Sequence, residues 1–112
     1  GHNRPDLKEF YHVGQPEPVG DMPSNVFPAE VPEFEKYAVE TYKTFENTGK
    51  KLLQAIALFL GLDEFYFENK VKNGDSILRA LHYFPIENPD AVPEGSVRAA
   101  AHGDINLITL LM

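Results

Sequence analysis

The central part of the chain has hydrophobic residues every three or four positions, which predicts one long helix. The stripe consists of Phe34, Ala38, Tyr42, Phe45, Gly49, Leu52, Leu53, Ile56 and Leu60. Pro32 suits the first helical position, and Gly61 suits the residue that follows the last helical turn. The stretch Asn47-Thr48-Gly49 is a weak point at which this helix could kink.

Shorter elements are predicted on both sides of this helix. The sequence "KEFYHVG" at 8–14 is a strand candidate within a proline-rich loop region. After the long helix, "DEFYFENKV" at 63–71 predicts a second, short helix capped by Asp63. "SILRALHYF" at 76–84 is then a second strand candidate, which Pro85 ends.

The last part of the chain predicts two more strands. After a loop at 85–96, we expect strands at Val97–His102 and Ile105–Leu111. Helices followed by antiparallel strands are typical of the α+β class. The final strand is almost entirely apolar, and an exposed apolar edge strand favours aggregation. We therefore expect that Met112 is not a natural domain boundary, and that more strands come from the same longer polypeptide or from a partner chain.

Composition narrows the functional classes. The 112 residues suffice for one small domain, and the net charge of −7 with no marked Lys/Arg cluster disfavours nucleic-acid binding. The chain has no cysteine, which removes disulfides, thiol nucleophiles and zinc–thiolate sites. We find no apolar run of membrane-spanning length and no secretion leader, so we expect no membrane association and a cytoplasmic location.

One short motif carries candidate chemistry. In the predicted strand that follows "RAAA", His102 and Asp104 are separated by Gly103. Alternate side chains of a strand point to the same face, so one imidazole and one carboxylate would converge. This is two thirds of the two-histidine, one-carboxylate set that binds Fe(II) and leaves positions open for substrates. By itself, a His-x-Asp motif also occurs by chance at a surface turn.

Four segments together extend the interpretation. "HGDINLITLL" resembles the iron-binding signature of the isopenicillin N synthase-like Fe(II)/2-oxoglutarate-dependent oxygenases. "DLKEFYHVG" resembles the Asp-x-Lys-Glu-aromatic-aromatic-His segment of that family. The stretch from "NVFPAEVPEFEKY" to "LGLDEFYF" resembles its Phe-Pro entry into a long helix, and "SILRALHYFP" resembles its Leu-Arg-x-x-His-Tyr strand. The segments occur in the family's order and cover nearly the whole chain.

The resemblance implies a fold and a set of site residues. The fold would be a double-stranded β-helix, or jelly roll, braced by the long helix and only partly present. Residues 1–75 would be the N-terminal loop and helical support region, and 76–112 the first strands of the oxygenase domain. The implied metal ligands are His102 and Asp104; the implied cofactor-binding residues are Tyr83 and, second, His82; and the candidate substrate-binding residues are Arg79 and His12.

The resemblance also implies the reaction. Fe(II) would be the metal, 2-oxoglutarate would be the co-substrate and O2 would be the oxidant. The reaction would oxidise a C–H bond of a small-molecule substrate, usually to an alcohol, and would release succinate and CO2. The family's second metal histidine and its Arg-x-Ser pair do not occur before Met112. Three alternatives therefore stay open: a catalytically incomplete binding module on the same scaffold, an Fe(II) oxidase that does not use 2-oxoglutarate, and a helical domain with a chance His-x-Asp.

Overall fold

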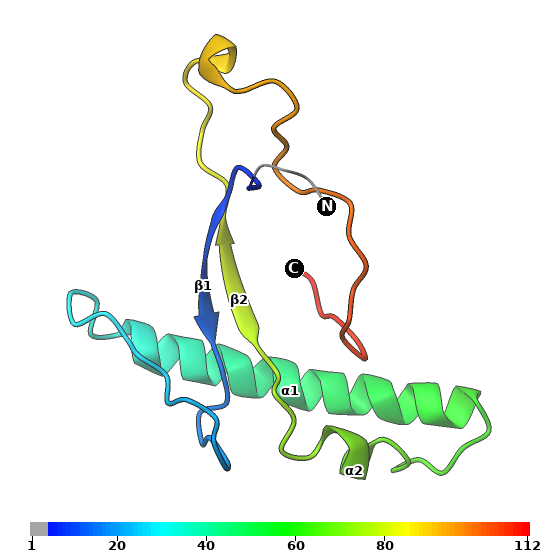
Figure 1. Cartoon of the computed structure of the whole chain (residues 1–112). Helices are drawn as coiled ribbons and strands as arrows, with labels where there is room; N and C mark the ends of the chain where they lie inside the picture. Colours follow the sequence, from blue (N-terminus) through cyan, green and yellow to red (C-terminus); the bar gives the residue numbers. More distant parts are fainter. Residues whose placement is uncertain (1–4) are drawn as a thin grey trace. The chain divides into compact units, whose positions relative to one another are not determined.

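The computed structural model describes residues 5–112 (Figure 1). In chain order it contains strand β1 (Glu9–Val13), helix α1 (Phe34–Phe59), helix α2 (Glu68–Val71), strand β2 (Leu78–His82) and a short 3-10 helix (Pro89–Ala91). One long helix and one two-stranded sheet are thus the main regular elements of the described chain, which agrees with the predicted α+β class.

The chain divides into two compact units. The first unit consists of the described residues up to His12 together with Arg79–Leu107. The second unit consists of Val13–Leu78 together with Ile108–Met112. The candidate metal ligands lie in the first unit, and α1 lies in the second.

The predicted long helix is confirmed as α1. It begins at Phe34, two residues after Pro32, and it runs without a break through Gly49 to Phe59. Gly61 follows the end of α1 with φ +69°, the left-handed conformation that a Schellman cap requires. The Gly61 N–H donates to Leu58 O at 3.0 Å, and the Leu62 N–H donates to Ala57 O at 2.9 Å. These bonds satisfy carbonyls that the last helical turn would leave without partners.

One face of α1 forms most of the core of the second unit. Its buried positions are spaced by four and seven residues: Ala38, Tyr42, Gly49, Leu53 and Ala57. The Tyr42 hydroxyl donates to Ser76 O at 3.2 Å, which ties the helix to the segment that enters β2. Burial is the main cause that raises the pKa of Tyr42, and the nearby carboxylate of Glu46 raises it further. The predicted stripe is confirmed in part, because Leu52, Ile56 and Leu60 remain 47%, 37% and 57% exposed.

The predicted second helix is shorter than the sequence suggested. Its regular part is the single turn Glu68–Val71, and Asp63 does not cap it. Instead, the Asp63 carboxylate accepts the Phe65 N–H at 2.8 Å and so stabilises a turn before α2. The aromatic residues 65–67 follow this turn and shorten the helix, because they have weak helix propensity.

Both predicted strands around the helices are confirmed. β1 and β2 pair in a two-stranded sheet, and they run in opposite directions (Figure 1). Val13 at the end of β1 is 2% exposed, whereas most other side chains of the two strands are exposed. A two-stranded ribbon gains little from burial, so side-chain pairs across it carry much of its local order.

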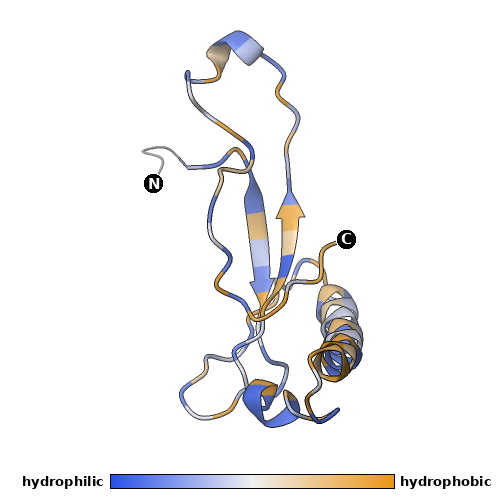
Figure 2. Ribbon diagram, turned by 90° about the vertical axis from the view of Figure 1, so that its right-hand side faces the viewer, coloured by the Kyte–Doolittle hydropathy of each residue, from blue (hydrophilic) through white to orange (hydrophobic). Residues whose placement is uncertain are grey.

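The two predicted C-terminal strands are wrong for the described chain. Residues 97–102 and 105–111 have no regular secondary structure. A strand needs a neighbour that accepts and donates backbone hydrogen bonds. Within residues 5–112, the bond from Leu7 N–H to Val97 O at 2.8 Å is a single backbone link to residues 97–102. The hydrophobic end of the chain is orange in Figure 2, and Ile105, Leu111 and Met112 are 98%, 85% and 98% exposed. The apolar character of 105–111 therefore indicates a segment suited to a sheet that residues 5–112 do not build.

Within residues 5–112, the structure contains no helix with both the length and the hydrophobicity to cross a membrane.

Substitution by alanine should change the stability of the chain in opposite directions at Gly49, within α1, and at Gly61, just after α1. A Cβ at Gly61 would meet no atom within 4 Å, so Gly61→Ala costs only backbone strain, about 1 kcal/mol. A Cβ at Gly49 would lie 3.6 Å from Leu110 Cδ1 and 3.7 Å from Ile108 Cδ1, which is ordinary contact. Gly49→Ala should therefore stabilise the chain by up to about 1 kcal/mol through helix propensity. Urea unfolding of both variants measures the two changes.

The opposite signs make each variant the control for the other. Equal destabilisation by both substitutions would show that Gly49 is needed for close packing. No change in Gly61→Ala would show that the positive φ after α1 is not maintained in solution.

Candidate active site

The imidazole of His102 is oriented by the backbone just before it. Its Nδ1 lies 2.9 Å from Ala100 O, and a carbonyl oxygen can only accept a hydrogen bond. Nδ1 therefore carries the proton, which leaves Nε2 as the ring nitrogen able to bind a metal. A backbone carbonyl that fixes the second ring nitrogen is a usual environment of a metal-binding histidine.

The carboxylate of Asp104 is also held locally. Its Oδ1 accepts the Asn106 side-chain Nδ2 at 2.7 Å and the Asn106 backbone N–H at 3.3 Å. These bonds form a turn in which the aspartate orders the two residues that follow it. The carboxylate is exposed, and it is therefore accessible from solvent.

An imidazole and a carboxylate are suitable Fe(II) donors, and they supply two of the three ligands of a facial triad. Among the described residues, no three His, Cys, Asp or Glu side chains are grouped closely enough to hold a metal ion. Because 97–102 is not a strand here, alternation along a strand does not explain how His102 and Asp104 would converge. The residue types fit part of an iron site, and the assignment of both as ligands stays a prediction.

A second group of side chains lies on one face of the β1–β2 ribbon. The Arg79 Nε donates to His12 Nε2 at 2.6 Å, across 67 residues of sequence. The Arg79 guanidinium also lies 5.1 Å from the centroid of the Phe10 ring, and this ring stacks on His12 with centroids 4.7 Å apart. The structure thus brings the two candidate substrate-binding residues together, with an aromatic ring against both.

The hydrogen bond from Arg79 determines the protonation of His12. Its Nε2 accepts that bond, so this nitrogen must lack a proton. Partial burial and, second, the positive charge of Arg79 lower the pKa of His12 below 6.5. His12 is therefore neutral at pH 7, with its other nitrogen, Nδ1, as the donor.

The candidate cofactor residues lie at the end of β2. His82 Nδ1 lies 2.6 Å from Glu9 Oε1, so this side chain faces a carboxylate of β1. Tyr83 follows the last residue of β2 and is 38% exposed. The structure therefore pairs His82 with Glu9 and His12 with Arg79, whereas His102 bonds to Ala100.

Sequence reasoning missed two participants. Phe10 is the ring that contacts both His12 and Arg79, and its spacing of two from His12 on a predicted strand could have indicated a shared face. Glu9 was not considered as the partner of His82, and nothing in a single sequence shows which residues two distant strands will place opposite each other.

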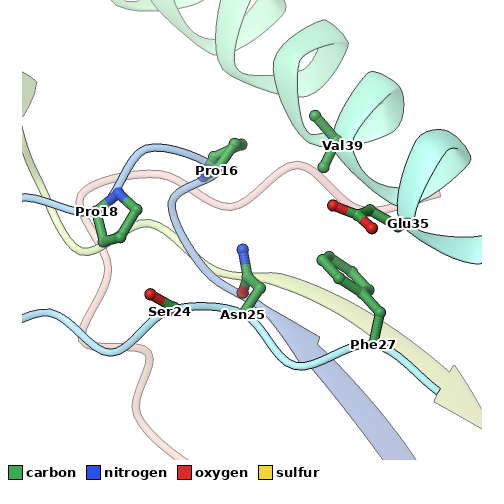
Figure 3. A pocket seen from close by; sticks show the side chains of 7 residues that line it. All are labelled: Pro16, Pro18, Ser24, Asn25, Phe27, Glu35 and Val39. Atoms are coloured by element: carbon green, nitrogen blue, oxygen red, sulfur yellow. The ribbon is translucent and has the colours of Figure 1, made fainter. Parts of the chain in front are cut away.

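A pocket of the second unit is separate from all of these residues. It has a volume of about 370 Å³ (Figure 3). Glu35 and Val39 of α1 line one side, and the other lining residues come from the loop before α1: Pro16, Pro18, Ser24, Asn25 and Phe27. The Asn25 side chain is occupied by bonds to the Gly14 backbone N–H and carbonyl, so it supports this loop.

Comparison with known proteins connects these features to one family. The chain is 31% identical over 96% of its length to a 2-oxoglutarate-Fe(II) type oxidoreductase, hxnY, of Emericella nidulans. It is 27% identical over 96% of its length to validamycin A dioxygenase of Streptomyces hygroscopicus subsp. limoneus. No family model matches the chain.

Solved structures agree. A 2OG-Fe(II) oxygenase family protein of Caulobacter crescentus matches with a TM-score of 0.78 and 41% identity over 95% of this chain. This chain is a homologue of the 2-oxoglutarate/Fe(II) oxygenases. A full-length protein of Neurospora crassa, solved in complex with α-KG, matches with a TM-score of 0.76 and 33% identity over 89% of this chain.

The resemblance predicted from sequence is therefore confirmed, and members of this family use Fe(II), 2-oxoglutarate and O2. The chain covers 34% of the Caulobacter crescentus protein and 31% of the validamycin A dioxygenase, or about a third of each. Members of this family have a jelly-roll fold, whereas residues 5–112 show one long helix and a two-stranded sheet, so the family's fold is present only in part.

The pair formed by Arg79 and His12 makes a prediction about pH. Arg79→Met should raise the pKa of His12 part of the way toward 6.5, because it removes the charge but not the burial, which is the larger cause. Any stability that neutral His12 contributes is complete above pH 6.5 and is lost as the pH falls through its lowered pKa. An NMR titration of the His12 ring protons measures the shift.

Arg98→Met is the matched control, because Arg98 bonds to Phe84 O rather than to His12. A His12 pKa at or above 6.5 in the unmodified chain would contradict the hydrogen bond that the structure shows.

Proposed function

We propose that the protein carrying this chain is a non-haem Fe(II)/2-oxoglutarate-dependent oxygenase. It oxidises a C–H bond of a small-molecule substrate, most simply by hydroxylation, and releases succinate and CO2. The observation that carries the proposal is the His102-Gly103-Asp104 motif with His102 Nδ1 bonded to a backbone carbonyl, in a chain homologous to oxygenases of this type.

In this proposal His102 binds the metal through Nε2, and Asp104 binds it through its carboxylate. When bound, Fe(II) supplies the activation of O2 and 2-oxoglutarate. The role of this chain is to hold the two metal donors in position. Ala100 O fixes the ring of His102, and Asn106 fixes one oxygen of Asp104.

The ribbon residues are proposed to bind the organic reactants. Tyr83, with His82 as the second choice, contributes polar groups to the co-substrate pocket. Arg79 and His12 contact the substrate, and Phe10 holds the guanidinium of Arg79 in place. A neutral His12 and a charged Arg79 would present N–H donors to an oxygen-bearing substrate.

We further propose the domain assignment and the partners. Residues 1–75 serve as a helical support region, and 76–112 contribute the first part of the jelly roll. The remaining barrel strands come from the same longer polypeptide or from a partner chain, and we expect the protein in the cytoplasm without nucleic-acid or membrane partners. The exposure of Ile105, Leu107 and Leu111 supports the proposal of further strands. These three side chains would share one face of an extended segment, and that face is not covered among residues 5–112.

An incomplete metal site on the same scaffold is the second candidate. The observation that favours it is the lack of a third grouped ligand among residues 5–112. An Fe(II) oxidase that does not consume 2-oxoglutarate is a further variant. Dependence of product formation on added 2-oxoglutarate separates the two enzymatic functions.

Removal of one ligand tests the proposal directly. In the complete protein, Asp104→Ala should lower the rate of Fe(II)-dependent 2-oxoglutarate consumption by roughly 100-fold or more. Mutation of a residue that only hydrogen-bonds to a metal ligand already lowers metal affinity or activity by about 10–100-fold, and loss of a ligand itself should cost more. His102→Ala should have a similar effect. Succinate production under saturating Fe(II) and 2-oxoglutarate is the measurement.

Asp21→Ala is the matched control, because Asp21 is an exposed aspartate of a turn in the second unit. Full turnover by Asp104→Ala would exclude this residue from the metal site. Absence of 2-oxoglutarate consumption in the unmodified complete protein would favour the binding module.

A further inference from the structure

Asp6 connects the segment before β1 to the segment before His102. Its carboxylate accepts the Ala100 N–H, at 3.2 Å to Oδ1 and 3.3 Å to Oδ2. The next residue of the same segment, Leu7, donates its N–H to Val97 O at 2.8 Å. Both contacts lie within the first compact unit.

Ala100 is thereby held on both of its backbone groups. Its N–H is bonded to the Asp6 carboxylate, and its carbonyl accepts from His102 Nδ1 at 2.9 Å. Because the two peptide groups flank a single Cα, fixing the first restricts the direction of the second. The carboxylate of Asp6 therefore acts on the His102 imidazole through one residue.

Asp6 is suited to this task by its surroundings. Its side chain is 20% exposed, and that of Lys8, which pairs with it at 2.8 Å, is 17% exposed. Reduced contact with water strengthens a hydrogen bond to a charged acceptor. The lysine partly neutralises the carboxylate, so the half-buried charge is not left without compensation.

We propose that Asp6 is a positioning residue for the candidate metal ligand His102. It does not touch the metal, and it sets the direction of the Ala100 carbonyl that fixes the ring of His102. The inference rests on the proposed role of His102 as a ligand. It connects the segment "DLKEFYH", which begins 94 residues before Ala100, to the metal motif through the Asp6–Ala100 hydrogen bond.

A purely structural role would have a different signature. If Asp6 only fastens residues 97–100 to the segment before β1, its removal lowers stability without a specific change in metal affinity. If Asp6 positions His102, the metal affinity falls even under conditions in which the variant is fully folded. The affinity and the melting temperature must therefore be measured on the same samples.

The experiment measures Mn(II) binding to the metal-free complete protein by isothermal titration calorimetry, with the melting temperature of each metal-free variant. Asp6→Ala should weaken Mn(II) binding about tenfold, the lower end of the range for groups that orient a ligand. Asp6→Asn keeps one oxygen that can accept the Ala100 N–H but loses the charge, and it should weaken binding about threefold. It also serves as the test if Asp6→Ala does not fold.

Lys8→Met is the matched control, because it removes the ion pair and leaves the Asp6–Ala100 bond in place. It should change the affinity by less than about twofold, because the Asp6 carboxylate still accepts the Ala100 N–H. Folded Asp6 variants with unchanged affinity would overturn the inference, and so would equal losses of affinity in Lys8→Met and Asp6→Ala.

His102→Ala separates this inference from the proposed function. If His102→Ala abolishes Mn(II) binding while Asp6→Ala leaves it intact, only the role of Asp6 is wrong. If His102→Ala leaves Mn(II) binding unchanged, both the proposed ligand and the positioning role fall.

Discussion

The pairing of β1 with β2 is the contact on which the candidate site depends. It joins segments that are far apart in sequence, since His12 and Arg79 are 67 residues apart, and it places them within hydrogen-bond distance. Closing so long a loop costs conformational entropy, which the ribbon offsets with cross-strand contacts such as those of Arg79 with Phe10 and of His82 with Glu9. β1 begins three residues after Asp6, whose carboxylate accepts the Ala100 N–H.

The helix could be predicted from sequence because its determinants are local. The spacing of apolar residues and the position of Gly61 suffice to predict α1 and its end. The structure shows the hydrogen bonds of the C-terminal cap that a glycine at this position permits. The extra exposure of Leu52 and Ile56 could not be predicted, because it depends on what packs against α1 rather than on its period. The C-terminal strands failed for a related reason, since a strand is defined by a neighbour that the sequence of the strand itself does not specify.

The sequence predicts the residue types of the candidate site but not its contacts. Chemistry and family resemblance predict His102 and Asp104 as metal donors; the homology to the oxygenases is confirmed, and the assignment of these two donors stays a prediction. The bond of His102 to Ala100 is local, whereas that of Ala100 to Asp6 joins residues 94 positions apart. Neither could be predicted from the sequence, because each uses a backbone group of Ala100. Backbone donors and acceptors are the same at nearly every residue, so they leave no trace in residue identity.

The C-terminal residues show how far a segment can meet the requirements of a sheet without forming one. Ile108 and Leu110 approach Gly49 of α1 within the second unit, and both are partly buried. Leu111, the next residue, is 85% exposed, so alternate side chains already divide into a packed row and an exposed row. One apolar row, Ile108 and Leu110, therefore has its cover in α1, while Leu107 and Leu111 of the other row stay exposed. The side-chain alternation typical of a strand is thus present through contact with α1, although residues 105–111 form no strand.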